Sequence, residues 1–132
     1  MRILITGSRT WTDTATIREA LAEVWHPSNV LLVGCAAGAD TLAEACWTHW
    51  GGAVEQWPAD WTGSCGASCP PGHRRVRRGR SICPRAGLVR NFAMISAGPD
   101  LCLAFIRNRS RGATHCAGWA ERAGIPTRVW AA

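Results

Sequence analysis

The sequence predicts an α/β fold in which a five-stranded parallel sheet carries helices on both faces. Short apolar runs alternate along the chain with longer segments of helical periodicity, and this alternation is typical of parallel strands joined by crossover helices. Small-residue or polar segments follow three of the runs, and in such sheets ligands bind beyond the carboxyl ends of the strands. The 132 residues are enough for one domain with a hydrophobic core and too few for two.

The predicted strands are short runs dominated by apolar residues. They comprise residues 2–6, 30–33, 53–57, 100–106 and 126–130. The first is a largely continuous apolar run, which suits a central strand buried on both faces. The last begins with Pro126, which cannot donate to a strand ladder, and it is therefore predicted to lie at an edge.

Each predicted helix lies between two of these strands and begins or ends at a capping or breaking residue. The first begins at the N-cap candidates of residues 12–14 and ends before Pro27. The second covers residues 41–50 and ends at two glycines. The third opens at residues 87–91, and the fourth covers residues 114–123, where a glycine stops it.

The alternation breaks between residues 60 and 84, and we interpret residues 62–84 as an insertion within a single domain of residues 1–132. This segment is rich in Gly, Pro, Cys and Arg and has almost no apolar periodicity. A loop of such length inside a compact domain is uncommon unless something orders it. Seven arginines and no acid fall between Arg74 and Arg90, while the other eight arginines face nine acidic residues, leaving the rest of the chain with a net charge of −1.

Composition also bears on where the protein works. No apolar run approaches the roughly 18 residues that cross a bilayer, and no basic and apolar leader precedes the first strand. The seven cysteines are an odd number, and thiols stay reduced in the cytosol, so a disulfide framework is not expected. We therefore expect a cytoplasmic protein with no membrane partner.

The stretch from Gly34 to Asp40 is the central candidate for binding, because it joins the second strand to the second helix. The first N–H groups of a helix, together with the helix dipole, form an anion site. Gly34 and Gly38 lack a Cβ and are expected to let a ligand approach the backbone. Asp40 cannot itself hold a phosphate; it either caps the helix or accepts a hydrogen bond from a ligand hydroxyl.

The insertion carries a candidate metal site. Cys65, Cys69 and His73 follow one another at intervals of four residues, and Cys83 comes after nine more. Three thiolates and one imidazole suit a tetrahedral structural zinc ion, and metal binding would supply the folding free energy that a polar loop lacks. The alternative is four unrelated residues in a disordered arm.

The same insertion contains the arginine-rich run from Arg74 to Arg80. Clustered guanidinium groups bind phosphates bidentately and release counterions, so the run predicts a contact with nucleic acid or polyphosphate. One alternative is a solvated, flexible charge run. Another is a lid over the ligand pocket, because the insertion lies between Trp61 and Arg90.

The remaining cysteines and two tryptophans at strand ends indicate a function less clearly than the residues above. The cysteines at positions 35, 46, 102 and 116 are predicted to be small core residues. Trp61 follows the end of the third strand, and Trp11 lies just beyond the first. Each tryptophan either stacks on the base or ribose of a ligand or simply packs against the core.

Several short blocks occur in a recognisable order along the chain. They are Gly7-Ser8-Arg9, Gly34-x-x-x-Gly38-Ala39-Asp40, Pro58-Ala59-Asp60-Trp61, Ala86-Gly87-x-x-Arg90-Asn91-x-x-Met94, Ala104-Phe105 with Gly112-Ala113-Thr114, and Ala123-Gly124-Ile125-Pro126. Together they resemble the YspA-type branch of the SLOG superfamily, the Rossmann-like group that contains DprA and the LOG phosphoribohydrolases. The resemblance covers almost the whole chain except the insertion.

This resemblance implies a three-layer Rossmann-like fold with a pocket for a nucleotide or a nucleotide-derived ligand, such as ADP-ribose or a signal nucleotide. By position in the family pattern, the ligand-binding residues would be Gly7, Ser8, Arg9, Gly34, Gly38, Ala39, Asp40, Arg90, Asn91, Gly112 and Thr114, with Asp60 and Trp61 as a wall. The resemblance further implies a homodimer that forms through helices.

The chain departs from the catalytic LOG pattern at one point. That pattern places a glutamate just after the block that corresponds to Gly112-Ala113-Thr114, whereas the nearest glutamate here, Glu121, lies two helical turns further on. Without the carboxylate, release of a base loses its acid/base group, so we expect a sensor or sequestering protein. The alternatives are a hydrolase that uses Arg90 with Asp40 or Asp60, and a nucleic-acid-binding module that acts through the arginine run.

Overall fold

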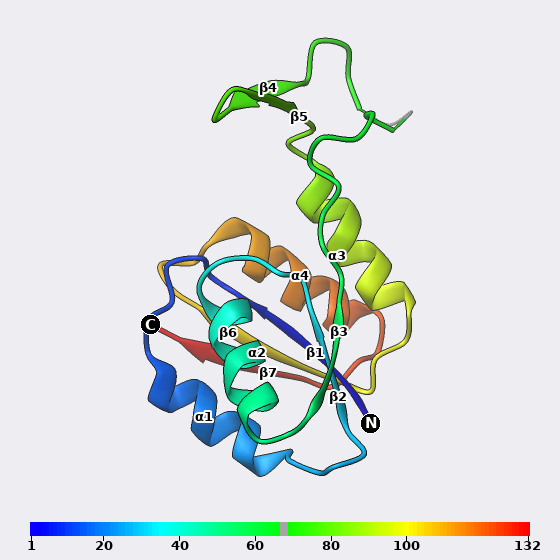
Figure 1. The fold of residues 1–132 in the computed structure, drawn as a ribbon. Helices are drawn as coiled ribbons and strands as arrows, with labels where there is room; N and C mark the ends of the chain where they lie inside the picture. The colour runs from blue at the N-terminus through cyan, green and yellow to red at the C-terminus, as the bar shows by residue number, and fades with distance from the viewer. Residues whose placement is uncertain (67–68) are drawn as a thin grey trace.

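The computed structural model describes residues 1–66 and 69–132 and confirms the predicted α/β fold (Figure 1). The main sheet is parallel, with the strand order β3-β2-β1-β6-β7. Its strands are β1 Arg2–Gly7, β2 Val30–Val33, β3 Ala53–Gln56, β6 Leu101–Ile106 and β7 Thr127–Ala131. As predicted, β1 is central and β7 lies at an edge. The strand order reverses beside β1, which is where the carboxyl ends of such a sheet leave a crevice.

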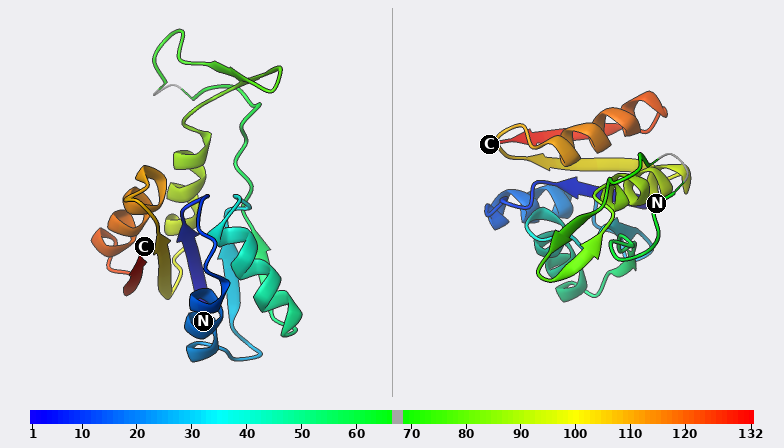
Figure 2. Two further views of the ribbon diagram at one scale, coloured as in Figure 1. Left: turned by 90° about the vertical axis from the view of Figure 1, so that its left-hand side faces the viewer. Right: turned by 90° about the horizontal axis from the view of Figure 1, so that it is seen from above.

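The helices of the described residues cover both faces of the sheet (Figures 1 and 2). They are α1 Thr14–Glu23, α2 Ala39–His49, α3 Ala86–Ser96 and α4 Arg111–Arg122. Because side chains alternate along a strand, Ile3 and Ile5 of β1 pack with α1 and α2, while Leu4 packs with α3 and α4. None of these helices combines the length and apolar character that a bilayer span requires.

Two helices begin earlier than the sequence pattern predicts. The α2 helix begins at Ala39, whose N–H donates to the carbonyl oxygen of Ser8 at 3.2 Å. The α4 helix begins at Arg111, after Ser110 adopts the extended backbone of an N-cap (φ −52°, ψ 136°). Asp40 therefore lies in the first turn of α2 rather than before it, and Gly112 lies in the first turn of α4.

The insertion contains a β-hairpin that the sequence pattern did not predict. The strands are β4 Arg75–Arg77 and β5 Arg80–Ile82, paired antiparallel. Arg78 and Gly79 form the turn with φ angles of +50° and +75°, as a type I′ turn requires. Three arginines among six strand residues hid the usual apolar alternation. The hairpin stands above the carboxyl edge of the main sheet, at the top of Figure 1; residues 67–68 of the predicted insertion lie outside the described residues.

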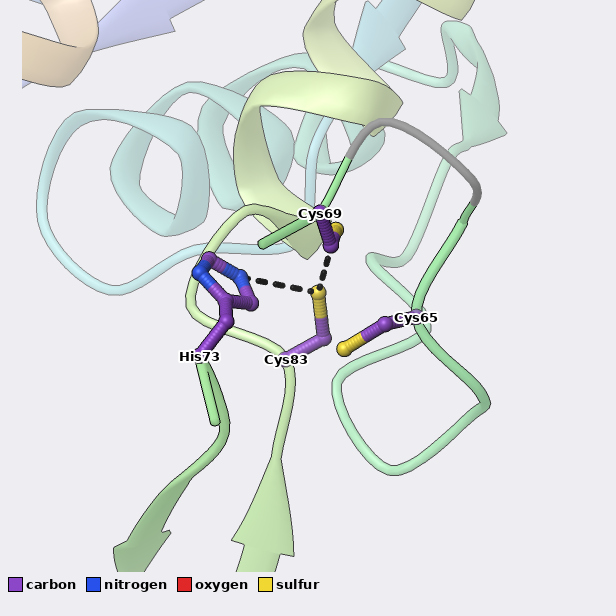
Figure 3. Close-up of side chains that lie close together, drawn as sticks. All are labelled: Cys65, Cys69, His73 and Cys83. Atoms are coloured by element: carbon purple, nitrogen blue, oxygen red, sulfur yellow. Dashed lines mark hydrogen bonds between the residues drawn. The ribbon is translucent and has the colours of Figure 1, made fainter. Parts of the chain in front are cut away.

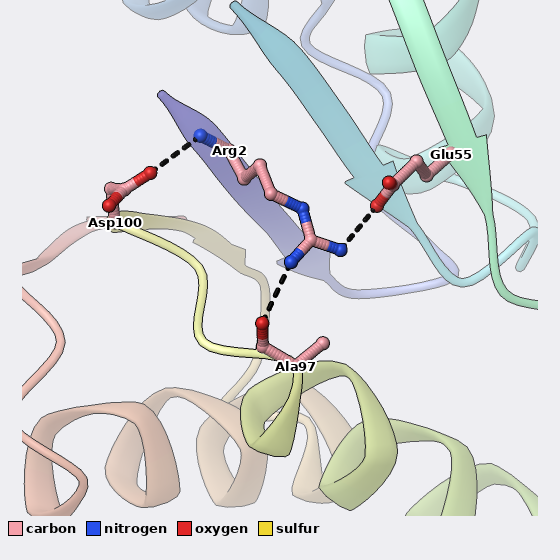
Figure 4. A network of polar contacts seen from close by, with 4 residues as sticks. All are labelled: Arg2, Glu55, Ala97 and Asp100. Atoms are coloured by element: carbon pink, nitrogen blue, oxygen red, sulfur yellow. Dashed lines mark hydrogen bonds and ion pairs between the residues drawn. The ribbon is translucent and has the colours of Figure 1, made fainter.

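A polar network at the opposite edge ties two other parts of the chain to the start of β1 (Figure 4). The Arg2 guanidinium donates to the Ala97 carbonyl oxygen and to Glu55, both at 2.7 Å, and the Arg2 backbone N–H donates to Asp100 at 2.8 Å. The Arg2 and Glu55 side chains are both about two-fifths exposed, so this pair adds little free energy. The network as a whole holds β3 and the α3–β6 turn in position beside β1.

Candidate functional site

A cavity of about 340 Å³ opens at the carboxyl edge of the sheet. It lies between the β1–α1 loop, the start of α2 and the first turns of α3 and α4. The predicted ligand-binding residues that line it are Gly7, Ser8, Arg9, Asp40, Trp61, Arg90, Asn91 and Gly112. Segments separated by up to a hundred residues therefore meet at the edge where the topology places a ligand site, although ligand contact itself stays a prediction.

Five predicted residues do not line this cavity. Gly34 lines a smaller adjoining cavity of about 160 Å³, and Asp60 lines a separate hollow beside α3. Gly38 and Ala39 lie behind the cavity wall, where Ala39 is fully buried. Thr114 is exposed on α4, because the helix begins at Arg111 and carries this residue past the cavity mouth.

The carboxylate of Asp40 is buried at the base of the cavity and is only 5% exposed. Its Oδ2 accepts hydrogen bonds from the backbone N–H groups of Gly34 (3.1 Å) and Ala36 (3.3 Å). It therefore braces the preceding loop instead of capping its own helix. Its Oδ1 is also buried and has no hydrogen-bond partner among the described residues. Burial raises the pKa of Asp40 to about 6, against the opposing effect of the two backbone hydrogen bonds and of Arg90.

The guanidinium of Arg90 crosses from α3 to the loop that Asp40 braces. Its Nη1 donates to the carbonyl oxygens of Gly34 and Trp57 (the latter at 3.3 Å), and its Nε donates to Asn91 at 2.8 Å. Burial lowers the pKa of Arg90, and the charge of Asp40 opposes that shift. The side chain thus joins the carboxyl ends of β2 and β3 to α3.

The two glycines of the β2–α2 loop serve the packing of the protein itself. A Cβ on Gly34 would lie 2.6 Å from the Arg90 guanidinium, and a Cβ on Gly38 would meet the backbone of Ser8 and Arg9. Gly38 also has a φ of +76°, which favours glycine. Protein atoms thus occupy the Cβ positions of both glycines, and the expectation that a ligand approaches their backbone stays a prediction.

Ser8 joins the β1–α1 loop to the start of α4. Its hydroxyl accepts from the N–H of Arg107 at 2.7 Å and lies 2.5 Å from the Ser110 hydroxyl. Ser110 is the N-cap of α4 but makes no side-chain capping bond, and both Ser110 and Gly112 line the cavity. The positive end of the α4 dipole therefore faces the cavity. Sequence reasoning missed Ser110, although a serine just before a helix signals an N-cap.

Trp61 forms one wall and is half-buried. The Arg9 guanidinium lies 5.4 Å from its ring centroid, within cation–π range. The Trp61 carbonyl oxygen accepts a hydrogen bond from the N–H of Cys83 at 2.8 Å, and this bond fixes the wall to the insertion. Trp11, in contrast, is 3% exposed and packs edge-to-face on Phe105, which decides in favour of core packing.

The four predicted metal ligands converge in the insertion (Figure 3). The ligand atoms of Cys65, Cys69, His73 and Cys83 all lie within 4.8 Å of one another. Tetrahedral zinc, with bonds of about 2.3 Å to sulfur and about 2.0 Å to nitrogen, separates two sulfurs by about 3.8 Å and a sulfur from a nitrogen by about 3.5 Å. The Sγ atoms of Cys69 and Cys83 are 3.8 Å apart, and the Cys83 Sγ lies 3.5 Å from the His73 Nε2. This group could therefore hold a metal ion.

Arg74 supports this cluster rather than facing solvent. Its Nη1 donates to the Gly63 carbonyl oxygen at 2.8 Å and to the Cys65 Sγ at 3.6 Å, and its Nε donates to Ser81 at 2.8 Å. A cation beside a thiolate ligand offsets the negative charge that three thiolates bring to a metal. Arg74, the first residue of the predicted arginine run, thus holds parts of the insertion together through these hydrogen bonds.

The remaining cysteines only partly follow the core prediction. Cys102 and Cys116 are buried and Cys46 is half-buried, whereas Cys35 is exposed. Cys35 has a φ of +60°, because the chain turns sharply as it leaves β2, and this conformation directs the side chain outward. The prediction of a core role for Cys35 was therefore wrong.

Comparisons with known proteins fit this architecture. Residues 1–63 match the family model described as "YspA, cpYpsA-related SLOG family". The chain is also 40% identical over 128 residues to the Gene 61 protein of Mycobacterium phage D29, an alignment that covers 95% of this chain and 92% of that protein. The chain belongs to the YspA, cpYpsA-related SLOG family.

A solved structure shares the fold of this SLOG protein. The X-ray structure of DNA processing protein A (DprA) from Streptococcus pneumoniae superposes with a TM-score of 0.67 at 17% identity. The match covers 97% of the SLOG protein and 49% of the DprA chain, so this protein spans about half of that structure. At this identity the likeness shows the fold alone. The family match ends at residue 63, so the metal-ligand cluster and the hairpin lie beyond it.

Replacement of the buried carboxylate, Asp40→Asn, is expected to stabilise this SLOG protein at pH 7.5. The folded-state pKa of about 6 lies above the ordinary value of 3.8, so ionisation of Asp40 penalises the folded state as pH rises through this interval. A shift of this size corresponds to about 1–3 kcal/mol. Urea unfolding should therefore show the full gain at pH 7.5 and a clearly smaller gain at pH 4.5, where the carboxyl is largely protonated in the folded state only.

The exposed carboxylate of Asp60 offers the matched control, because Asp60→Asn makes the same change outside the cavity. It should leave the free energy of unfolding unchanged at both pH values. A wild-type protein that is more stable than Asp40→Asn at pH 7.5 would contradict this interpretation, since it would mean that attraction to Arg90 outweighs burial.

Proposed function

We propose that this SLOG protein binds a nucleotide or nucleotide-derived ligand, of ADP-ribose type or a signal nucleotide, and acts as a sensor or sequestering protein. The observation that carries the proposal is the buried Oδ1 of Asp40, which lacks a hydrogen-bond partner among the described residues in a side chain that borders the cavity. A buried acceptor left unpaired costs free energy, and a ligand hydroxyl that donates to it recovers that cost. Ribose supplies such hydroxyls.

The rest of the cavity suits the phosphate of the same ligand. The first turn of α4 presents N–H groups without a side-chain cap. Apart from its chain neighbours and the backbone of its own helix, no heavy atom of the described residues lies within 4 Å of the Cβ position of Gly112. Backbone can therefore approach a phosphate closely at this helix end. Arg9 adds a cation at the mouth, and among the described residues that line the cavity Asp40 is the one acid.

The way the charged groups are used supports binding without turnover. Arg90 is held by two carbonyl oxygens and Asn91, and Asp60 lies on a different hollow. One observation favours the competing hydrolase: a carboxyl with a pKa of about 6 is suited to general acid–base catalysis near neutral pH. Release of free base from ADP-ribose or nucleoside monophosphates, abolished in Asp40→Asn, would favour that alternative.

Calorimetric titration with ADP-ribose and the ribonucleoside monophosphates tests the binding proposal. Asp40→Asn should weaken the best-bound ligand by about 10- to 100-fold, the usual range for a lost hydrogen bond to a charged group. Wild-type affinity should also fall as pH drops below about 6, because protonation removes the acceptor, while Asp40→Asn should lack this dependence. Asp60→Asn is the control and should bind as the wild type does.

The outcome that would contradict the proposal is equal affinity in the wild type and Asp40→Asn for every ligand tested. No detectable binding of any of these ligands to a wild-type protein that is fully folded would contradict it as well.

We further propose that Cys65, Cys69, His73 and Cys83 hold a structural zinc ion. The donor set, the sulfur–sulfur and sulfur–nitrogen spacings and the donated hydrogen bond from Arg74 support this assignment. Thiolate ligands also suit the reducing cytoplasm expected from the sequence. Zinc would order the insertion, whose described residues bury little apolar surface besides Ile82 and Cys83.

Metal analysis of the purified protein should find one zinc per chain. Cys69→Ser should lose most of it and should increase proteolysis within residues 62–84, because the free energy that orders the insertion is lost. Cys35→Ser is the matched control, since Cys35 is an exposed thiol away from the cluster, and it should keep the full amount. A wild-type protein without stoichiometric metal, or unchanged by a chelator, would end the proposal.

A further inference from the structure

We propose that the arginine hairpin, residues 75–82, forms a second anion subsite beside the cavity, and that the natural ligand is a nucleotide with a chain of two or more phosphates. This inference rests on the proposed function and adds the class of ligand to it. It concerns a part of the chain beyond the residues that match the family model.

The hairpin and the main cavity are joined by a shared wall. A hollow of about 620 Å³ is lined by Arg77, Arg78 and Arg80 on the hairpin side and by Arg9 and Trp61 on the other. Arg9 and Trp61 also line the 340 Å³ cavity. A ligand seated in the cavity can therefore continue into the hollow without leaving the surface of the protein.

The register of the hairpin places Arg77 and Arg80 on the face that borders this hollow. Arg77 pairs with Arg80 and Arg75 pairs with Ile82, so these four side chains share one face of the hairpin. Ile82 on that face is 7% exposed, whereas Val76 on the opposite face is 75% exposed. The arginine-bearing face is thus the inner one.

The inner arginines have no counter-charge of their own. The side chains of Arg77, Arg78 and Arg80 make no hydrogen bond or ion pair within residues 1–66 and 69–132, and no acid of these residues lines the hollow. Like charges placed directly opposite one another, as in the Arg77–Arg80 pair, destabilise a two-stranded sheet. Arg74 differs, because its hydrogen bonds commit it to the loop. The hollow is therefore a cluster of cations that an anion would stabilise.

A polyphosphate chain fits these observations better than a nucleic-acid strand. Proteins that bind single strands stack successive bases on several aromatic side chains. Trp61 is the one aromatic residue that lines either the cavity or the hollow in the described part of the chain. The surface thus offers a platform for one base and several guanidinium groups for phosphates, which bind them bidentately.

The test compares nucleoside mono- and triphosphates by calorimetric titration on the full chain. For the best-bound nucleoside, the triphosphate should bind at least about tenfold more tightly than the monophosphate, because several charge-assisted hydrogen bonds are added. The double variant Arg77→Gln/Arg80→Gln should lower triphosphate affinity to the level of the monophosphate and leave monophosphate affinity unchanged. Inorganic tripolyphosphate should compete with the triphosphate in the wild type only.

Arg75→Gln provides the matched control, because it removes the same charge from the same hairpin at a position that does not line the hollow. It should change triphosphate affinity less than twofold. Circular dichroism and zinc content, measured on each variant, verify that the hairpin is intact.

The possible failures are distinguishable. If the wild type binds mono- and triphosphates equally and the double variant changes neither, the second subsite is overturned while the nucleotide cavity stands. If no nucleotide binds, both the second subsite and the proposed function are overturned. If the double variant loses affinity for single-stranded oligothymidine but not for the triphosphate, the hairpin belongs to a nucleic-acid interface and the inference is wrong.

Discussion

The buried carboxylate of Asp40 is the interaction on which the rest of the site depends. One of its oxygens holds the loop that follows β2 through the N–H groups of Gly34 and Ala36. That loop in turn presents the Gly34 carbonyl oxygen to Arg90, which brings α3 against the ends of β2 and β3. The other oxygen is buried and has no hydrogen-bond partner among the described residues. A single side chain therefore both braces the wall and keeps one acceptor unpaired there, which the proposed ligand would use.

Burial of the Asp40 carboxylate costs free energy that its hydrogen bonds and the charge of Arg90 do not fully offset. The pKa of Asp40 is raised for this reason. The fold would be more stable with a neutral group at this position, and such unfavourable groups collect at binding and catalytic sites. An amide could also brace the loop without this cost, and the carboxylate at this position therefore supports the proposed binding role.

The fold could be predicted from the sequence because its signals are local. The alternation of apolar runs with helical segments predicts that the strands are parallel, and Pro126 predicts that the last strand lies at an edge of the sheet. The residues that meet in the cavity followed from the same topology, since the loops after β1 and β6 must lie at one edge. The start of α4 was placed too late, because Ser110 signals its N-cap more weakly than the apolar periodicity that begins beyond it.

What the sequence could not supply were the features that depend on contacts between distant residues. The space beside Gly34 is filled by Arg90, fifty-six positions along the chain. The missing hydrogen-bond partner of the Asp40 Oδ1 among the described residues can be recognised only when the positions of the neighbouring groups are known. The hairpin was hidden because its strands are arginine-rich, and it is joined to the preceding loop by the hydrogen bonds of Arg74 with Ser81 and Gly63.

The insertion adds a surface that lies beyond the residues matched by the family model. The metal-ligand cluster connects through the Cys83–Trp61 hydrogen bond to the wall of the cavity, so ordering the insertion also positions that wall. The cations of the hairpin then extend the site outward from the same tryptophan. The cavity and the hollow under the hairpin, the two parts of the proposed binding site, thus meet at Trp61 and Arg9.

The central claim is that the cavity holds a phosphorylated nucleoside whose hydroxyl donates to Asp40. Mass spectrometry of small molecules released by denaturing the purified wild-type protein and Asp40→Asn tests it most directly. The account predicts a nucleotide-derived molecule from the wild type and a large reduction in its amount from the variant. Equal amounts of the same molecule from both proteins, or a released molecule that has no ribose, would contradict it.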